Sequence, residues 1–235
     1  MVETVHEYYT QQSILPTHGE FMSKDAMDKY ERMRREIFTQ RLHLPAQLFR
    51  DSDLIEFGPD SGENAVVFAT WGANCTLIEP NRNAHAVIKE YFKRYGLSSR
   101  LTALEGCDVL QYGKTHPGVA EFDIVIAENS LFTLRPAASW ISVVARLLRP
   151  DGMLMFGYMD AYGGFLELLT KAIHARIRRT TEQDAVSAAT SFLGPKWDTI
   201  PHKRTLEAFV MDVLENPFTR LQYLMEPVSI SRSMH

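Results

Sequence analysis

Residues 53–81, DLIEFGPDSGENAVVFATWGANCTLIEPN, decide the fold of this chain. They contain two short apolar runs, Leu54–Phe57 and Thr76–Ile78, and each run ends at a small cluster of Gly, Pro or acidic residues. A segment of helix length separates the two runs. This order predicts a strand, a helix and a second strand, with a binding site where the strands end.

The same alternation continues through the middle of the chain. We expect strands at Leu54–Phe57, Thr76–Glu79, Leu101–Leu104, Phe122–Ala127 and Met153–Phe156, and helices at Glu63–Trp71, Asn83–Tyr95 and Ala137–Leu148. The strands are apolar throughout rather than alternating, which is typical of a parallel sheet covered on both faces. Residues 51–157 are therefore expected to form an α/β core, an open and mostly parallel sheet with helices on both faces.

Helical segments are expected on either side of this core. In residues 1–50, apolar residues recur at Met27, Tyr30, Met33 and Ile37, after Ser23 as a helix N-cap. This spacing predicts N-terminal helices that lie over the site.

Residues 158–235 lack the strand–helix alternation. Helical patterns occur at Gly164–Arg178, Glu182–Phe192 and Leu206–Leu214, and Gly163 with Gly164 forms a candidate hinge. We expect a mainly helical cap or lid over the substrate.

The composition is that of an ordinary globular protein of 235 residues. The formal net charge of −4 argues against a dedicated nucleic-acid binder, which needs a dense basic surface. The only cysteines are Cys75 and Cys107, too few for a zinc site or a disulfide framework, and Cys75 is expected to be a buried free thiol. Since the sequence shows neither a long apolar run nor a signal-peptide pattern, we expect a cytoplasmic protein without a membrane span.

The residues at the strand ends indicate a ligand that contains a nucleoside. Gly58 lets a ligand approach the main chain, and Gly62 lets the next helix pack closely. The start of that helix offers free N–H groups to an anion. Glu79, twenty-one residues after Gly58, is placed to accept hydrogen bonds from two ribose hydroxyls.

Five motifs in this order resemble those of the class I S-adenosylmethionine-dependent methyltransferases. LIEFGPDSGENA (54–65) and TLIEPN (76–81) are similar to the first two motifs. ALEGCDVLQY (103–112) and FDIVIAENSLFTL (122–134) are similar to the third and fourth, and LLRPDGMLMFG (147–157) is similar to the turn that enters the fifth strand. The resemblance covers residues 50–157. It implies a Rossmann-like fold, S-adenosylmethionine as cofactor and S-adenosylhomocysteine as product.

The resemblance also implies a role for each residue of the cofactor site. Near the methionine end it places Glu56, Gly58, Asp60, Ser61 and Gly62. It places Glu79 at the ribose, Pro80 beside the adenine, Asp108 and the backbone of Val109 at the adenine amino group, and Glu128 and Asn129 on the floor near the methyl group. Tyr9 and Tyr30 reach over the cofactor from the N-terminal helices.

The sequence departs from the family pattern in two places. Asp60 replaces the middle glycine of the first motif, which disfavours a dinucleotide enzyme because a carboxylate repels a pyrophosphate. At the C-terminus, family members usually add two strands, and only PVSIS (227–231) suggests a fragment of one.

The methyl acceptor is expected to be a small molecule, because the fourth motif lacks the Pro-Pro-aromatic turn that stacks a flipped base. Candidate catalytic residues are Asp160, Tyr158 and His174, although Asp160 is equally suited to cap a helix. In HARIRR (174–179), Arg176 and Arg179 share a helix face and indicate an anionic acceptor; the alternative is a solvated face, as for HKR (202–204).

These observations predict an S-adenosylmethionine-dependent methyltransferase that methylates oxygen or nitrogen of a small molecule by direct displacement, with an anionic molecule as one candidate acceptor. Two alternatives stay open: a module that binds the cofactor without catalysis, and an aminopropyl transferase of the same fold. Metal ligands are limited to Glu128, Asn129 and Asp160, so we favour a reaction without metal. The sequence does not indicate an oligomeric state.

Overall fold

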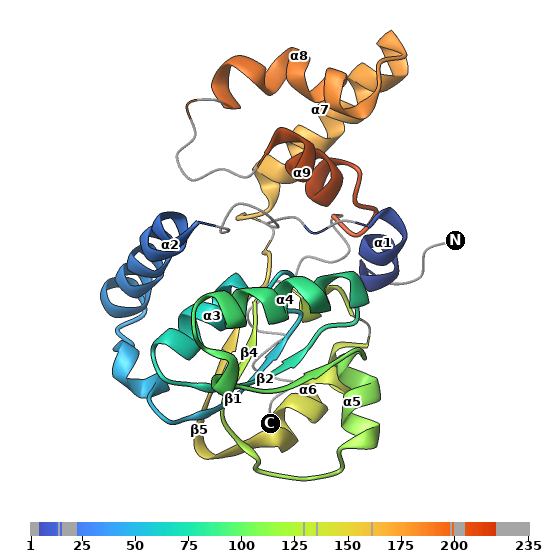
Figure 1. The fold of residues 1–235 in the computed structure, drawn as a ribbon. Coiled ribbons are helices and arrows are strands. Elements are labelled where there is room, and N and C mark those ends of the chain that lie inside the picture. Colours follow the sequence, from blue (N-terminus) through green and yellow to red (C-terminus); the bar gives the residue numbers. More distant parts are fainter. Residues whose placement is uncertain are drawn as a thin grey trace.

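The computed structural model describes residues 5–13, 15, 23–128, 130–134, 136–160, 162–197, 199 and 205–219. At its centre lies a five-stranded sheet in the order β3-β2-β1-β4-β5 (Figure 1). The strands are β1 (Asp53–Phe57), β2 (Asn74–Ile78), β3 (Leu101–Glu105), β4 (Phe122–Ala127) and β5 (Leu148–Phe156). All four pairings are parallel, which confirms the open, Rossmann-like sheet expected from the sequence.

The strands are apolar throughout because successive side chains point into two different cores. On one face Leu54 packs with Ile124 and Ile126, and on the other Ile55 packs with Val125.

Helices cover both faces. The first face carries α2 (Lys24–Glu36), α3 (Glu63–Thr70) and α4 (Arg82–Arg94), and the second carries α5 (Val109–Thr115) and α6 (Ala137–Leu147). Short helical turns link them: η1 (Ile37–Arg41), η2 (Ala46–Phe49), η3 (Ser98–Arg100) and η4 (Leu131–Thr133). An aromatic cluster anchors the first face, formed by Phe38, Phe49, Phe68 and Trp71.

A separate helical layer lies beyond the carboxyl ends of the strands (Figure 1). It consists of α7 (Phe165–Thr181), α8 (Ala185–Trp197), α9 (Leu206–Phe209) and the π-helical turn η5 (Val210–Leu214). The N-terminal helix α1 (Val5–Gln12) joins this layer, since Val5 and Tyr8 pack against Phe218.

The elements differ from the expected ones in a few places. The helix α5 was not expected, and β5 begins five residues earlier than predicted. Pro195 lies inside α8, which continues to Trp197 rather than ending at Phe192. The predicted strand fragment at 227–231 and the basic cluster at 202–204 lie outside the described residues.

The two cysteines are both free thiols. Cys75 is fully buried in β2, as expected, and burial raises the pKa of its thiol. Cys107 is half-buried, and burial raises the pKa of its thiol to about 11, helped by the nearby acids Glu105 and Asp108. Over the described ranges, no helix has both the length and the apolar character to span a membrane.

Candidate cofactor site

The turn after β1 brings the main chain close to β4. Gly58 has φ +70°, and a Cβ atom added there would lie 2.5 Å from Cβ of Ser130. Ser130 holds the turn in place, because its Oγ donates a hydrogen bond of 2.7 Å to the carbonyl oxygen of Phe57. Gly62 has φ +91° and lies against Ile88 of α4. The turn therefore requires glycine at 58 and 62, as the first motif implied.

Asp60 takes the place of the expected middle glycine by adopting a left-handed conformation, with φ +52°. Its backbone N–H donates to Oε2 of Glu79 over 3.0 Å. Glu79, at the end of β2, thus fixes the strained backbone of Asp60 in the turn after β1.

Glu79 lies at the carboxyl end of β2 and is 4% exposed. Its Oε1 accepts a hydrogen bond of 2.7 Å from the backbone N–H of Asn81, while Oε2 accepts the one from Asp60. Burial raises its pKa to about 7, and the two backbone N–H groups limit the rise. Because a carboxylate has about four acceptor positions, two remain for further donors.

Glu56 lies one residue before the end of β1 and is 2% exposed. Among the described residues, its Oε2 has no hydrogen-bond partner. Burial raises the pKa of this carboxyl well above its usual range; Glu128 adds to the rise and Arg34 opposes it. Since a buried acceptor without a donor is costly, this atom indicates that a ligand supplies the donor.

Arg34 of α2 contacts Glu128, the residue that follows β4. Its guanidinium forms two hydrogen bonds to the carboxylate of Glu128, one of them 3.0 Å from Nη1 to Oε2. It also lies over the ring of Phe38, 5.1 Å from the centroid. Glu128 raises the pKa of Arg34, against the effect of burial. Arg34 is therefore a cation buried beside two acids, Glu56 and Glu128.

Arg34 is not among the site residues predicted from the sequence. Along α2 and the following turn η1, the buried residues are Met27, Arg34 and Phe38, while the predicted Tyr30, Met33 and Ile37 are half-buried. The useful signal was an arginine four residues after a tyrosine and four before a phenylalanine. A charge on an apolar helix face points to a buried partner.

A family model described as a methyltransferase domain matches residues 30–190, about two thirds of the chain. The chain belongs to this methyltransferase family. Its parallel sheet and glycine turn are those of the class I S-adenosylmethionine-dependent methyltransferases. No curated protein sequence matches the chain.

Solved structures of other proteins are similar to the chain. The PH0226 protein from Pyrococcus horikoshii is 17% identical, with a TM-score of 0.50 over 70% of this chain and 71% of that one. The YcgJ protein from Bacillus subtilis is 15% identical, with a TM-score of 0.42 over 55% and 53%. A 1,6-didemethyltoxoflavin-N1-methyltransferase from Burkholderia thailandensis is 19% identical, with a TM-score of 0.41 over 68% and 67%. The chain spans about half the length of YcgJ and of a putative methyltransferase from Bacillus halodurans.

The residues predicted to bind adenine lie at two adjacent strand ends. Pro80 follows β2 and is half-buried, while Asp108 and Val109 follow β3. Asp108 is the N-cap of α5, because its Oδ1 accepts a hydrogen bond of 2.8 Å from the backbone N–H of Gln111. Gly106, two residues before Asp108, lies close to Arg82 and to the ring of His85.

The remaining residues of the predicted cofactor site are placed as follows. Ser61 donates a hydrogen bond of 2.7 Å to Glu63, and the Tyr30 hydroxyl donates one of 2.6 Å to Asn64 at the start of α3. Tyr9 lies in α1, and its hydroxyl contacts Asp212 of η5 in the helical layer. Asn129 lies outside the described residues.

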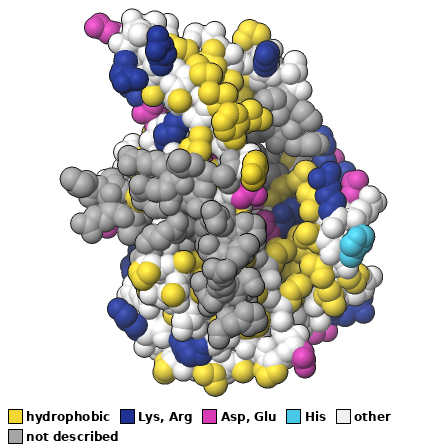
Figure 2. All heavy atoms as spheres, turned by 180° about the vertical axis from the view of Figure 1, so that it is seen from behind, with side chains coloured by type: hydrophobic (Ala, Val, Ile, Leu, Met, Phe, Trp, Pro, Cys, Tyr) yellow, Lys and Arg dark blue, Asp and Glu magenta, His cyan; other side chains and the backbone are white. Residues whose placement is uncertain are grey.

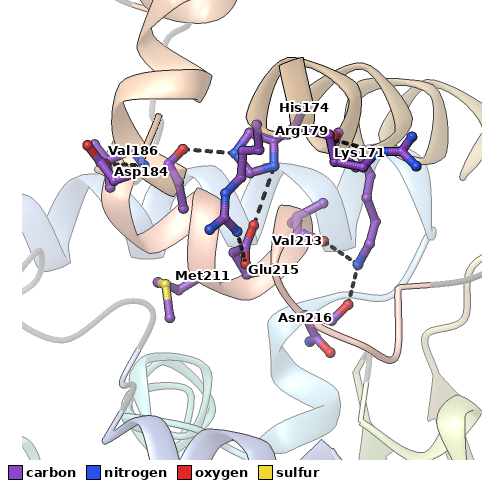
Figure 3. Close-up of polar contacts among 12 residues, drawn as sticks. Lys171, His174, Arg179, Asp184, Val186, Met211, Val213, Glu215 and Asn216 are labelled. Carbon is purple, nitrogen blue, oxygen red and sulfur yellow. Dashed lines mark hydrogen bonds and ion pairs between the residues drawn. The ribbon is translucent and has the colours of Figure 1, made fainter. Parts of the chain in front are cut away.

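The three predicted catalytic residues have different surroundings in the structure. Tyr158 stacks on Phe156 at the end of β5, with ring centroids 5.7 Å apart. Asp160 caps the next turn, since its Oδ1 accepts hydrogen bonds from the backbone N–H groups of Tyr162 and Gly163. His174 is 1% exposed inside the helical layer, where Nε2 lies 2.8 Å from the carbonyl oxygen of Ala185 (Figure 3).

The predicted anion-binding arginines lie on the exposed side of α7. Arg176 and Arg179 share this face, as the helical spacing predicted, but α7 leads away from the sheet (Figure 1). Arg178 turns aside and donates to Glu215 over 2.7 Å. Among the described residues, no three His, Cys, Asp or Glu side chains gather as a metal site would require.

Proposed function

We propose that this protein is an S-adenosylmethionine-dependent methyltransferase that acts on a small molecule. The observation that carries the proposal is the pair of buried acids at adjacent strand ends. One oxygen of Glu56 has no donor among the described residues, and Glu79 has acceptor positions to spare. β1 and β2 are neighbours in register, so the two acids lie along one edge of the sheet.

The residues present fit this cofactor. It carries donors at two places, an ammonium group on the methionine part and two hydroxyls on the ribose. Glu56 would accept from the ammonium, and Glu79 from the hydroxyls. Arg34 would bind the methionine carboxylate through its planar fork, with Glu128 moving aside from it.

Pro80 and the segment Gly106–Val109 would hold the adenine between β2 and β3. Asp108 has one carboxylate oxygen engaged in capping α5, so the other can accept from the adenine amino group. Tyr30 would cover the cofactor from α2.

S-adenosylmethionine supplies an electrophilic methyl group on a sulfonium centre. The protein contributes by holding the acceptor in line with that group and by excluding water. We propose that residues 1–50 and 158–235 cover the core 51–157 and so enclose the acceptor. Figure 2 shows a hollow between the helical layer and the sheet layer, with charged side chains inside it and hydrophobic ones around it.

The acceptor is proposed to be nucleophilic without a strong base. His174 is engaged inside the helical layer, and Asp160 already accepts two backbone hydrogen bonds. A neutral amine or ring nitrogen, or an oxygen that ionises readily, meets this condition.

Two measurements test the proposal: isothermal titration calorimetry for cofactor binding, and an assay with labelled cofactor for methyl transfer. Purified protein should bind S-adenosylmethionine and S-adenosylhomocysteine, and should transfer a labelled methyl group to at least one compound in a panel of small amines, phenols and carboxylic acids. Tight binding without transfer would favour a binding module. Preference for decarboxylated S-adenosylmethionine would favour an aminopropyl transferase, and would also argue against the role given to Arg34.

A further inference from the structure

The helix α7 is turned with its polar side inward. Lys171 donates from Nζ to the carbonyl oxygens of Val213, over 3.3 Å, and of Asn216 (Figure 3). His174 is buried against Ala185, and Arg178 pairs with Glu215. These three residues recur at spacings of three and four, so they define one face of the helix, packed on η5 and the start of α8.

The opposite face of α7 is apolar and exposed. Phe165 is 59% exposed, Leu166 69%, Leu169 45% and Ile173 41%. Tyr162, in the turn before the helix, is 93% exposed. At 100° per residue the four helix side chains, Phe165, Leu166, Leu169 and Ile173, share one side of α7. Figure 2 shows hydrophobic side chains gathered over the helical layer.

This arrangement reverses the usual one, in which a surface helix buries its apolar side. The inner hydrogen bonds fix the helix in this orientation, so the apolar face is presented to the exterior. Large exposed apolar patches mark surfaces that another body covers.

Positive charge at the C-terminal end of this face favours an anionic partner. Arg176 and Arg179 continue it toward the C-terminus and are exposed. In α7, which the structure describes throughout, the one acidic residue is Glu167, and helical spacing places it on the other side. The face is therefore apolar and locally basic on a chain whose net charge is −4.

We propose that this face of α7 docks on an anionic lipid bilayer. The helix would lie along the interface, with Phe165, Leu166, Leu169 and Ile173 in the apolar boundary and the two arginines at the phosphates. A single convex helix face suits such a flat partner better than a small molecule, which needs a concave pocket. A second copy of the same face would bring no carboxylate to the arginines. The proposal does not rest on methyl transfer.

Vesicle co-sedimentation tests it with the full chain. Wild-type protein should sediment with vesicles of phosphatidylcholine and phosphatidylglycerol, and much less with phosphatidylcholine alone. The double variant Phe165→Glu/Leu169→Glu should lose at least about a hundredfold in partitioning, because two buried apolar side chains are replaced by anions. Arg176→Ala/Arg179→Ala should lose roughly fivefold per arginine on anionic vesicles only.

Matched controls separate this face from general stickiness. Val119→Glu changes an apolar side chain that is 66% exposed on the surface of the α/β domain. Arg32→Ala removes an exposed arginine of α2. Both variants should bind vesicles as wild type does. Absence of wild-type binding to anionic vesicles would overturn the proposal. Equal binding to both lipid mixtures, or self-association in gel filtration that the Phe165→Glu/Leu169→Glu variant abolishes while vesicle binding is absent, would overturn it as well.

Discussion

Glu79 is the residue on which the cofactor assignment depends most. It is held by the backbone N–H groups of Asp60 and Asn81, so its position is fixed before any ligand arrives. This pre-organisation favours tight binding, because little side-chain freedom is lost when the ribose is bound.

We therefore expect Glu79→Ala to weaken binding of S-adenosylmethionine by on the order of 2–4 kcal/mol, because two charge-assisted hydrogen bonds are lost. Asp108→Ala should weaken binding less, since only one adenine contact disappears. Calorimetry measures both constants, with circular dichroism as the check on folding. An unchanged dissociation constant for Glu79→Ala would remove the ribose assignment.

The pKa of Glu79 predicts how cofactor affinity depends on pH. Burial raises this pKa to about 7, and the carboxylate accepts from two hydroxyls better than the neutral acid does. Affinity should therefore rise as pH increases through 7, and should fall by up to about tenfold per pH unit below it. Titrations from pH 6 to pH 8 test this, with Glu79→Gln as the variant that flattens this part of the profile. An equally steep profile in that variant would assign the titration to another group.

Glu56 is expected to lower the stability of the ligand-free protein at neutral pH. Burial raises its pKa above the value of 4.5 that it has when exposed, so the folded state favours the neutral acid while the unfolded chain ionises. Its contribution is full below the unfolded pKa and is lost as pH rises toward the folded pKa. Glu56→Gln should therefore be more stable than wild type at pH 8, with little difference near pH 4.5.

Urea unfolding at the two pH values measures this difference. Glu36→Gln is the matched control, because Glu36 is an exposed residue of α2. A Glu56→Gln variant whose advantage does not grow with pH would contradict the explanation.

Among the elements, the turn after β1 depends on the absence of a side chain. Gly58 has φ +70° and faces Ser130, while Gly96 has φ +71° and no heavy atom of the described residues within 4 Å of the added Cβ. Both positions resist alanine through backbone strain, but only position 58 adds a clash. Gly96→Ala should cost about 1 kcal/mol, and Gly58→Ala about 2–4 kcal/mol.

Ser130→Gly in the Gly58→Ala background should recover the part of the loss that comes from the clash. Denaturant unfolding of the two single variants and the double variant gives the coupling between the sites. Equal losses at positions 58 and 96 would show that Ser130 does not limit the turn.

The sheet could be predicted from the sequence because its strands are short apolar runs that end at glycine or acidic residues. α5 was missed because it has seven residues, with Gly113 inside it, too few to show a helical period. Arg34 was missed because its partner Glu128 lies 94 residues away, and sequence spacing does not reveal such a pair. The sequence offered His174 as a candidate base and did not reveal its burial. The contacts that bury it, with Ala185 and Glu215, form only when α7, α8 and η5 assemble.

At the scale of the whole molecule, the two ends of the described chain meet. The Tyr8 hydroxyl donates to the carbonyl oxygen of Met211 over 2.7 Å, and the Tyr9 hydroxyl contacts Asp212 and Asn216. α1 therefore links the first residues to η5, and the helical layer belongs to both ends of the sequence.

Removing these hydroxyls should loosen the helical layer and leave the sheet unchanged. In Tyr8→Phe/Tyr9→Phe, amide hydrogen exchange at Val210–Leu214 should accelerate about five- to thirtyfold, as expected for one or two net hydrogen bonds. Exchange in β1 and β4 should stay as in wild type. Tyr162→Phe is the control, since that side chain is almost fully exposed. Unchanged exchange in η5 would mean that apolar contacts alone hold α1.

The two thiols have a practical consequence for spectroscopy. Cys75 is sealed in β2, and Cys107 is partly open to solvent one residue before Asp108. A maleimide or a fluorinated alkylating reagent should therefore modify the native chain at one place, slowly at neutral pH because little of the thiol with pKa about 11 is ionised. The label would sit beside the proposed adenine position, so the protein carries its own attachment point for a reporter of cofactor occupancy.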